Sequence, residues 1–259
     1  MQHIGDLLAG LPLPDDPPGD AAAALEDSGT SLFEPEVLQD LGADLPAGHL
    51  HLWGGPSGAG KTGFLLALLL GAGVRGRRGV YVTYHLAASS LAVRLLGMAA
   101  GLDTEALTTG HLDDEQVARA VAARRCLRAL PLFVLEARGL TVASIEDRLV
   151  RMPFRAEVVG VDYLQAVLRE PGSDIGSTVR AFSALASRLH LALVAALQAT
   201  DDGLPEVSRL ADRAGWIAPA GGSGVRRAEV IRNRYGQRPA VPLRIDASTG
   251  ALRRVPDPD

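Results

Sequence analysis

The feature that most constrains the fold of this chain is a glycine-rich segment, GPSGAGKT, at residues 55–62. It fits the phosphate-loop pattern of glycine, four residues, glycine, lysine and then serine or threonine. Residues 49–54 before it, HLHLWG, alternate as a strand does, and the apolar run GFLLALLLGA after it is long enough for a buried helix. In that setting glycines let backbone N–H groups turn inward around a polyphosphate, at a helix N-terminus that already favours anions.

Two side chains at the end of this loop carry the expected chemistry. Lys61 would reach the β- and γ-phosphates of a nucleotide, and the Thr62 hydroxyl would ligate magnesium. Lys61 is also the only lysine of the chain. A compact ammonium on a flexible stem differs chemically from a planar guanidinium, so its single use at this position supports phosphate binding. The residues predicted to hold the nucleotide are Gly55, Pro56, Ser57, Gly58, Ala59, Gly60, Lys61 and Thr62.

The composition of the chain limits which classes of protein it can belong to. The chain has 259 residues, of which 47% are hydrophobic and 22% charged, so it can bury one substantial core as a single α/β domain. A net charge of −4 gives no global attraction to nucleic acid. The lone Cys126 excludes an internal disulfide and a cysteine-rich zinc site. No signal peptide or bilayer-spanning run is visible, which predicts a soluble cytoplasmic protein without membrane contact.

The chain divides into a tail and one folded domain. Residues 12–30 are rich in proline, alanine and acid, and residues 1–11 are either disordered, which we favour, or a short docking segment. We therefore assign residues 1–30 to an acidic tail or linker, 31–255 to the domain and 256–259 to a second tail. Apolar strand-like runs alternate with helix-length segments, which predicts a mostly parallel twisted sheet flanked by helices. The candidate strands are 49–53, 80–84, 132–135, 156–161 and 191–197.

Two of these strands end in polar side chains. Asp162 follows a hydrophobic strand, at the position where phosphate-loop enzymes hold the water shell of magnesium. An aspartate there is otherwise commonly a turn residue or an N-cap. Gln198 ends the strand of residues 191–197 and could sense the γ-phosphate or position the attacking water. Between the two strands, a helix covering the sheet is predicted from the helical spacing of Ile175, Val179, Phe182, Ala186 and Leu189.

Four stretches together resemble the ATPase motor domain of the DnaB-type replicative helicases, within the wider RecA-like group. The resemblance covers roughly residues 31–255 and implies a RecA-like phosphate-loop fold with ATP and Mg²⁺ as ligands. It also implies ATP hydrolysis coupled to single-stranded DNA, and a homo-oligomer in the form of a six-membered ring with nucleotide at its interfaces. The stretches are LPAGHLHLWGGPSGAGKT at 45–62, SSLAVRLLGMAAGL at 89–102, VVGVDYLQ at 158–165 and AEVIRNRYG at 228–236.

The resemblance assigns a role to two arginines near the end of the domain. In the family, basic residues on a late strand reach the γ-phosphate of the neighbouring subunit, and Arg232 and Arg234 match them, with Arg232 standing where lysine is usual. Such a charge stabilises the transferring phosphoryl group and is worth about 10³–10⁵ in rate. The alternative is a solvated basic strand edge in an arginine-rich chain.

One position departs from the family at the point where water is activated. Reading back without a gap from Arg94, His85 falls where the family has the glutamate that deprotonates the attacking water. A neutral histidine can accept a proton, but its ring places the nitrogen differently and can be cationic beside phosphates. Three readings stay open: His85 is a replacement base, another acid is recruited, or ATP is bound with slow or no hydrolysis. We favour the third, because loss of a general base costs roughly 10²–10⁴ in rate.

The loop expected to grip DNA also departs from the family. The residues after Gln198 read ATDDGLPEVSRL, so Asp201 and Asp202 would repel a phosphate backbone, and the loop after Asp162 offers only Arg169. Any contact with single-stranded DNA is therefore expected to be weak. Two functions follow from the sequence: an ATP-driven helicase-class motor, or a degenerate paralogue that binds ATP as a regulatory or assembly module. A small-molecule kinase is a weaker third, because nothing resembles an acceptor-binding lid.

Overall fold

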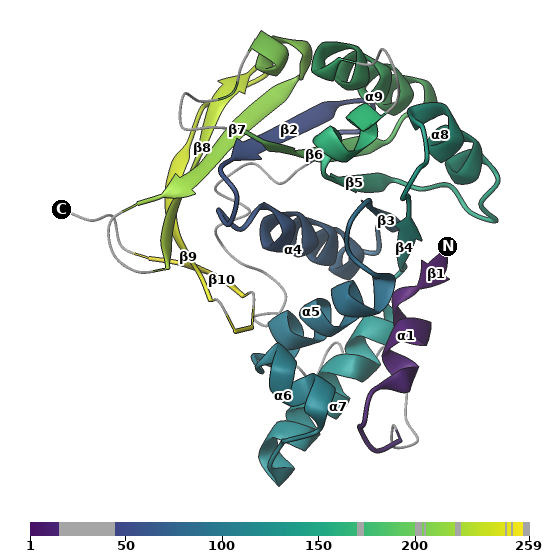
Figure 1. Ribbon diagram of the computed structural model, residues 1–259, viewed down its shortest axis with the longest axis vertical. Helices are drawn as coiled ribbons and strands as arrows, with labels where there is room; N and C mark the ends of the chain where they lie inside the picture. Colours follow the sequence, from purple (N-terminus) through teal and green to yellow (C-terminus); the bar gives the residue numbers. More distant parts are fainter. Residues whose placement is uncertain are drawn as a thin grey trace.

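One continuous sheet organises the molecule (Figure 1). The computed structural model describes residues 1–15, 45–169, 174–199, 204, 206–220, 224–246, 248–249 and 251–255. Within this part the strand order is β1-β4-β3-β5-β6-β2-β7-β8-β9-β10, with the strands from β4 to β7 parallel and the outer ones antiparallel. The strands are β1 (Gln2–His3), β2 (Leu50–Gly55), β3 (Gly79–Thr83), β4 (Leu132–Glu136), β5 (Val158–Asp162), β6 (Ala192–Gln198), β7 (Arg213–Pro219), β8 (Val225–Asn233), β9 (Ala240–Ile245) and β10 (Leu252–Arg254).

Helices cover both faces of the parallel part, as the alternating sequence pattern predicts. One apolar cluster joins α4, α5 and α7 to one face, and a second joins α8 and α9 to the other (Figure 1). The α-helices are α1 (Ile4–Leu7), α4 (Lys61–Val74), α5 (Ala88–Ala100), α6 (Thr104–Thr109), α7 (Asp114–Ala129), α8 (Val142–Val150) and α9 (Ile175–Leu189). The 3₁₀ segments are η1 (Leu8–Gly10), η3 (Leu164–Arg169) and η4 (Glu206–Leu210).

The five strands predicted from the sequence are all present, each within two residues of its expected limits. The predicted helix is α9, which begins at a capping box formed by Asp174 and Ser177. Val179 and Phe182 on its expected inner face are fully buried against the sheet. None of the described helices is both long and apolar enough to cross a bilayer.

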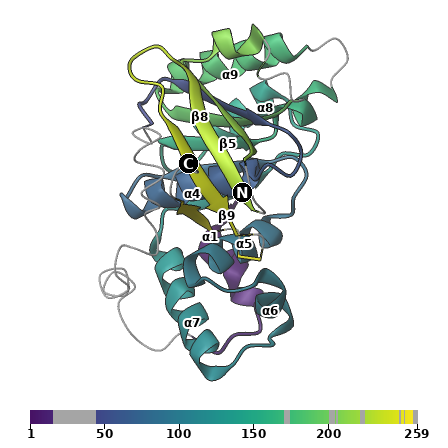
Figure 2. The same cartoon turned by 90° about the vertical axis from the view of Figure 1, so that its left-hand side faces the viewer.

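Four strands at one side of the sheet, β7 to β10, have no counterpart among the predicted strands. β7 joins β2 in parallel, and β8, β9 and β10 then follow as antiparallel neighbours. Figure 2 shows β8 and β9 side by side at this side of the molecule, in front of α4. Their sequences mix arginine, proline and small residues, so the periodic apolar signal of a buried strand is weak there.

The N-terminal residues correct one of the sequence predictions. We favoured disorder for residues 1–11, but Gln2 and His3 extend the sheet by pairing with β4, and α1 lies beside α5 and α7 (Figure 1). Ile4 and Leu8 are fully buried in the main apolar cluster. The docking alternative is therefore the correct one, because two apolar side chains suffice to anchor a short segment. The predicted boundary at residue 31 and the tail at 256–259 lie outside the described residues.

Candidate nucleotide-binding site

The phosphate loop leaves the carboxyl end of β2 and enters the first turn of α4. Gly58 and Gly60 have φ values of 75° and 92°, in the left-handed region that residues with a Cβ rarely adopt. A Cβ on Gly55 would lie 2.2 Å from the carbonyl oxygen of Ile217. Glycine is therefore required at all three positions, and the loop forms the tight turn at a helix N-terminus that anion binding needs.

Lys61 is folded back onto the loop that carries it. Its Nζ donates to the carbonyl oxygens of Gly55 at 2.8 Å and Pro56 at 2.7 Å. Burial lowers the pKa of Lys61 from its usual value, and the nearby Asp162 carboxylate opposes this shift. The ammonium thus lies within the loop, bound to two carbonyl oxygens that a phosphate would replace as its partners.

Three polar side chains meet at the carboxyl end of β5. The Thr62 hydroxyl and the Tyr81 hydroxyl both donate to Oδ2 of Asp162, each at 2.8 Å. Asp162 is 2% exposed and Tyr81 is equally buried. Burial, with the Asp162 charge second, raises the pKa of Tyr81 well above its usual value, so its phenol stays protonated at neutral pH. A buried carboxylate is tolerated here because two hydroxyls donate to it.

A cavity of about 310 Å³ opens over the loop. It brings together most of the residues that the sequence nominates, from three separate strand ends and the loop itself. Gly55, Pro56 and Ala59 shape the loop without lining the cavity, and Ala59 is buried. The nominated residues that line it are Ser57, Gly58, Gly60, Lys61, Thr62, His85, Asp162 and Gln198.

Sequence reasoning missed several residues of this cavity. Arg94 contributes to the family resemblance, but nothing in the sequence assigned it a place beside the phosphate loop. Ile245 and Asp246 come from the end of β9, and the Ile245 side chain lies so close to Gly60 that a Cβ there would be 2.0 Å from its Cδ1. No local sequence pattern signals the contacts of Ile245 and Asp246, because they depend on how the antiparallel strands fold over the loop.

His85 lies beyond the end of β3, at the rim of the cavity. Its side chain is exposed, and its ring meets Tyr163 edge to face, with 5.1 Å between the ring centres. The structure therefore places the histidine in the same cavity as Thr62 and Asp162.

Two carboxylates are candidates for the recruited acid, Asp246 in the cavity and Glu136 at the end of β4, the strand beside β3. Glu136 ends the neighbouring strand β4, but its Oε1 accepts the backbone N–H of Ala88, the first residue of α5, at 2.7 Å. Asp246 lines the cavity, yet the N–H of Thr249 and both donors of Ser248 hold the pKa of its carboxyl at about 2. One caps a helix and the other is a weak proton acceptor, so neither is set up as a general base.

Gln198 ends β6 at the edge of the same cavity. Its backbone N–H donates to Oε1 of Gln165 at 3.1 Å, and the Gln165 amide donates in return to the Gln198 carbonyl oxygen. This pair joins the segment after Asp162 to the end of β6. The Gln198 side chain, which is exposed, remains available to a ligand in the cavity.

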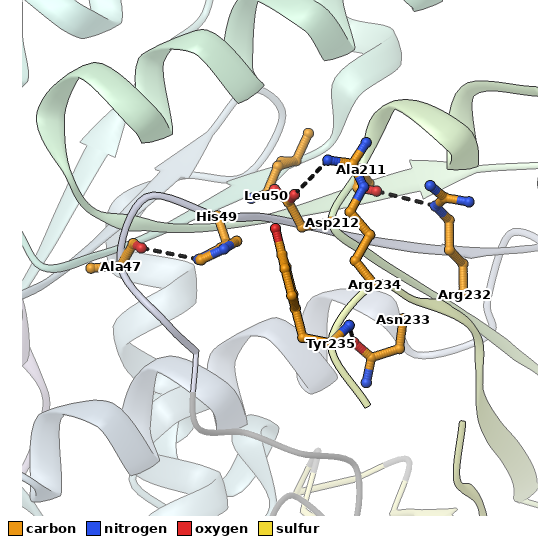
Figure 3. Close-up of polar contacts among 9 residues, drawn as sticks. All are labelled: Ala47, His49, Leu50, Ala211, Asp212, Arg232, Asn233, Arg234 and Tyr235. Carbon is orange, nitrogen blue, oxygen red and sulfur yellow. Dashed lines mark hydrogen bonds and ion pairs between the residues drawn. The ribbon is translucent and has the colours of Figure 1, made fainter. Parts of the chain in front are cut away.

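Arg232 and Arg234 lie beside the amino end of β2, at the opposite end of the strands from the cavity. Figure 3 shows their polar contacts. Arg232 Nε donates to the Ala211 carbonyl oxygen at 3.3 Å, and Arg234 Nη1 lies 3.3 Å from Asp212 Oδ1. The second oxygen of Asp212 accepts the backbone N–H of Leu50 at 3.0 Å, at the start of β2.

The register of the sheet separates these arginines from their own phosphate loop. Arg232 pairs with Ala214, which pairs with Leu52, three residues before Gly55. Arg234 is further away still, so about 10 Å or more of strand lies between either backbone and the loop. The structure therefore does not bring the arginines into the cavity formed by the same chain.

The residues present fit a magnesium–nucleotide complex. One cavity is lined by the glycine loop, which has no room for added Cβ atoms at Gly55 and Gly60, and by Lys61. Thr62 and Asp162 add a hydroxyl and a carboxylate to the same cavity. Oxygen donors of this kind suit Mg²⁺, which keeps most of its water and binds one or two protein ligands beside phosphates.

The parallel sheet, the loop after β2 and the aspartate that ends β5 define a RecA-like phosphate-loop ATPase fold. A family model described as the DnaB-like helicase C terminal domain matches residues 36–203, more than half of the chain. The chain therefore belongs to the family of DnaB-like helicase C-terminal domains.

Individual relatives are distant. The replicative DNA helicase DnaB of Rickettsia bellii is 26% identical over 200 residues, covering 67% of this chain and 40% of the relative. A probable plasmid replicative DNA helicase of Chlamydia muridarum is 23% identical over 205 residues, covering 73% of this chain and 46% of the relative. The chain spans less than half the length of these two curated relatives.

Solved structures agree on the fold. One of them, described as an ATPase domain, superposes with a TM-score of 0.72 at 13% identity, covering 80% of this chain and 85% of that one. A DnaB-like replicative helicase, described together with its interactions with primase, gives a TM-score of 0.72 at 14% identity, covering 82% and 60%. At such low identity these likenesses speak for the RecA-like architecture alone.

Proposed function

We propose that this protein binds ATP with Mg²⁺ at the phosphate loop and couples ATP hydrolysis to movement on single-stranded DNA. The observation that carries the proposal is the assembly of Lys61, Thr62 and Asp162 in one cavity at the ends of adjacent elements. Membership of the DnaB-like family supports the DNA-directed part of the proposal.

Each loop residue has a defined task. Lys61 moves from the carbonyl oxygens of Gly55 and Pro56 to the β- and γ-phosphates, which are stronger acceptors for an ammonium. Thr62, which donates to Asp162 in this structure, would give its hydroxyl oxygen to Mg²⁺, and Asp162 would hold the metal's water shell. Bound Mg²⁺ neutralises the charge that builds up on the phosphate oxygens.

Water activation falls to the exposed side chains at the rim. Gln198 orients the attacking water, and a neutral His85 takes its proton on a ring nitrogen. Because the His85 ring and the Gln198 amide are both exposed, this half of the site has fewer fixed contacts than the half around Asp162.

The remaining catalytic charge comes from another copy of the chain. Arg232 and Arg234 lie too far along the sheet to reach their own cavity, so a homo-oligomer, and in this family a six-membered ring, would bring them to the neighbour's γ-phosphate. Single-stranded DNA would be a weak ligand of the ring's channel. Weak DNA binding is predicted from the acidic Asp201 and Asp202 and from Arg169 as the one basic residue of its loop. The two aspartates and the Arg169 side chain lie outside the described residues.

A second function is favoured by one observation. His85 stands at the base position, and the carboxylates of Glu136 and Asp246 are both held by hydrogen bonds to backbone N–H groups. A protein with this site would bind ATP with little hydrolysis and act as a regulatory or assembly module.

One set of measurements separates the two functions. ATP turnover is measured for the unmodified protein, Lys61→Ala and His85→Glu, each with and without single-stranded DNA. Turnover above the Lys61→Ala level, raised by DNA, supports the motor. Binding of ATP without turnover supports the module, and absence of both ATP binding and turnover contradicts both proposals.

The single lysine allows a direct test of the site itself. A reagent that acylates amines can modify only Lys61 and the N-terminal amine, because the chain has no other lysine. ATP with Mg²⁺ is expected to protect Lys61 and leave the N-terminal amine equally reactive, as read by peptide mass spectrometry. Equal labelling of Lys61 with and without nucleotide would show that the loop does not bind it.

A further inference from the structure

Tyr81 is a buried tyrosine in the middle of a core strand. It lies on β3 between Val80 and Val82, opposite Gly160 of β5, and only 2% of it is exposed. A phenylalanine would fill the same space, so the hydroxyl is the part of this side chain that packing does not explain. A buried hydroxyl without a partner is costly, and this one donates to Asp162 Oδ2 at 2.8 Å.

Two hydroxyl donors converge on a single oxygen of Asp162. Thr62 from α4 and Tyr81 from β3 both donate to Oδ2, and within the described residues no hydrogen bond is made to Oδ1. Asp162 is one of the residues that line the cavity over the phosphate loop. Donors from two separate elements thus fix the rotation of this carboxylate and leave Oδ1 as its remaining acceptor.

We infer that Tyr81 is a positioning residue of the magnesium site: its hydroxyl holds Oδ2 of Asp162 so that Oδ1 is presented to the water shell of the metal. The inference rests on the proposed binding of Mg²⁺ and nucleotide at this loop. When Thr62 turns its oxygen toward the metal, Tyr81 is the partner whose bond to Asp162 need not change. Outer partners of this kind set the orientation of the groups that hold a metal.

The chain offers a matched control on the same strand end. Tyr84 is also buried, at 6% exposure, and its hydroxyl donates to the Leu140 carbonyl oxygen at 3.2 Å. Tyr84 belongs to the apolar cluster on the opposite face from α4 and does not line the cavity. Tyr84→Phe therefore removes a buried tyrosine hydroxyl that does not bond to the Asp162 carboxylate. The backbone N–H of residue 84, which donates to the Asp162 carbonyl oxygen at 3.1 Å, is kept in this variant.

The test measures Mg²⁺ dependence and nucleotide binding separately. A fluorescent ATP analogue is titrated into the unmodified protein, Tyr81→Phe and Tyr84→Phe, first in EDTA and then at increasing Mg²⁺. Tyr81→Phe is expected to bind the analogue normally in EDTA but to need about tenfold more Mg²⁺ for the metal-dependent gain in affinity. Tyr84→Phe is expected to match the unmodified protein in both series.

The outcomes are distinct. An unchanged Mg²⁺ midpoint in Tyr81→Phe, or an equal shift in Tyr84→Phe, overturns the positioning role while nucleotide binding stands. No binding of the analogue by the unmodified protein overturns the proposed function and this inference together.

A second readout avoids the variant altogether. In protein labelled with ¹³C at the tyrosine ring, the Tyr81 resonance is expected to move when Mg²⁺ is added to the nucleotide complex, and the Tyr84 resonance to stay. A Tyr81 resonance that ignores Mg²⁺ contradicts the inference even if Tyr81→Phe does not fold.

Discussion

At the carboxyl end of β2 a lysine and an aspartate lie inside a cavity, whereas at its amino end charged and aromatic side chains lie at the surface, although they too contact the same chain. Lys61 and Asp162 are hydrogen-bonded inside a cavity. At the other end Arg234 is exposed beside Asp212, and Tyr235 is 67% exposed, with its ring edge on His49 (Figure 3).

This difference indicates which parts of the proposed active site one chain supplies and which parts it does not bring to its own cavity. The carboxyl end contains the residues that are proposed to hold a nucleotide, and the amino end carries two arginines that lie too far along the strands to enter that cavity. If the proposed ring forms, each active site combines the carboxyl end of one subunit with the amino end of its neighbour. Substitutions at the two ends are expected to have effects that range from loss of turnover to small changes in stability.

The arginines test the division most directly. Arg234→Ala is expected to lower DNA-stimulated ATP turnover by about 10³-fold, because it removes a positive charge that would stabilise the transferring phosphoryl group at the neighbouring subunit. Lys61→Ala is expected to be inactive as well. Mixed and reassembled, the two variants should recover turnover, since a Lys61→Ala subunit supplies its arginine to an intact neighbouring loop. A mixture that stays as inactive as its components would show that the two ends do not combine between subunits.

Variants of His85 test whether the proposed nucleotide site is complete except for a general base. If His85 leaves the site without a base, as in the proposed ATP-binding module, His85→Glu is expected to raise ATP turnover by roughly 10²–10⁴-fold, because a carboxylate accepts the proton of the attacking water at neutral pH. His85→Gln is the matched control, with nearly the same shape as glutamate and no basic group, and it should give no rise. An increase in both variants would assign the effect to the removal of histidine.

His51 tests the cost of an unpartnered group on β2 itself. Its ring is 2% exposed, and within the described residues neither ring nitrogen has a hydrogen-bond partner. His51→Leu is therefore expected to raise the free energy of unfolding by about 1–3 kcal/mol at pH 7. His49→Leu is the control, because that ring is half-buried and bonded to the Ala47 carbonyl oxygen at 3.0 Å, and it should give no gain.

The same histidine gives the molecule a pH dependence of known sign. Burial, followed by the charge of Arg213, lowers the pKa of His51 from 6.5 to about 3. Between these values the unfolded chain binds a proton that the folded chain does not, so stability falls as pH drops from 6.5 toward 3, by about 1.4 kcal/mol per unit. Urea unfolding of the unmodified protein and His51→Leu at pH 7 and pH 5 measures this, and equal slopes in both proteins would contradict it.

Glu136 gives the smallest expected effect. Glu136→Gln keeps an oxygen acceptor for the Ala88 N–H, so it should lower stability by at most about 1 kcal/mol and leave ATP turnover unchanged. Thermal unfolding and turnover are measured together. A large fall in turnover with stability intact would show that Glu136 is the recruited acid after all.

Local patterns in the sequence were sufficient to predict the central strand β2, the phosphate loop and the helix α4 that follows it. The alternation of β2, the glycines at 55, 58 and 60 and the apolar run of α4 lie within about 25 consecutive residues, and each follows from local backbone chemistry. Asp162 and Gln198 were found in the same way, as polar residues that end buried strands. Residues that follow the carboxyl ends of adjacent parallel strands necessarily lie near one another.

The tertiary structure alone decided what those residues touch. The Tyr81 hydroxyl reaches Asp162 only because β3 is the neighbour of β5, and Ile245 reaches Gly60 only because β9 folds back over the loop. The docking of Ile4 and the distance of Arg232 from its own loop likewise depend on strand order and register. Contacts between residues distant in sequence are set by packing of the whole chain, and no local pattern of residues carries that information.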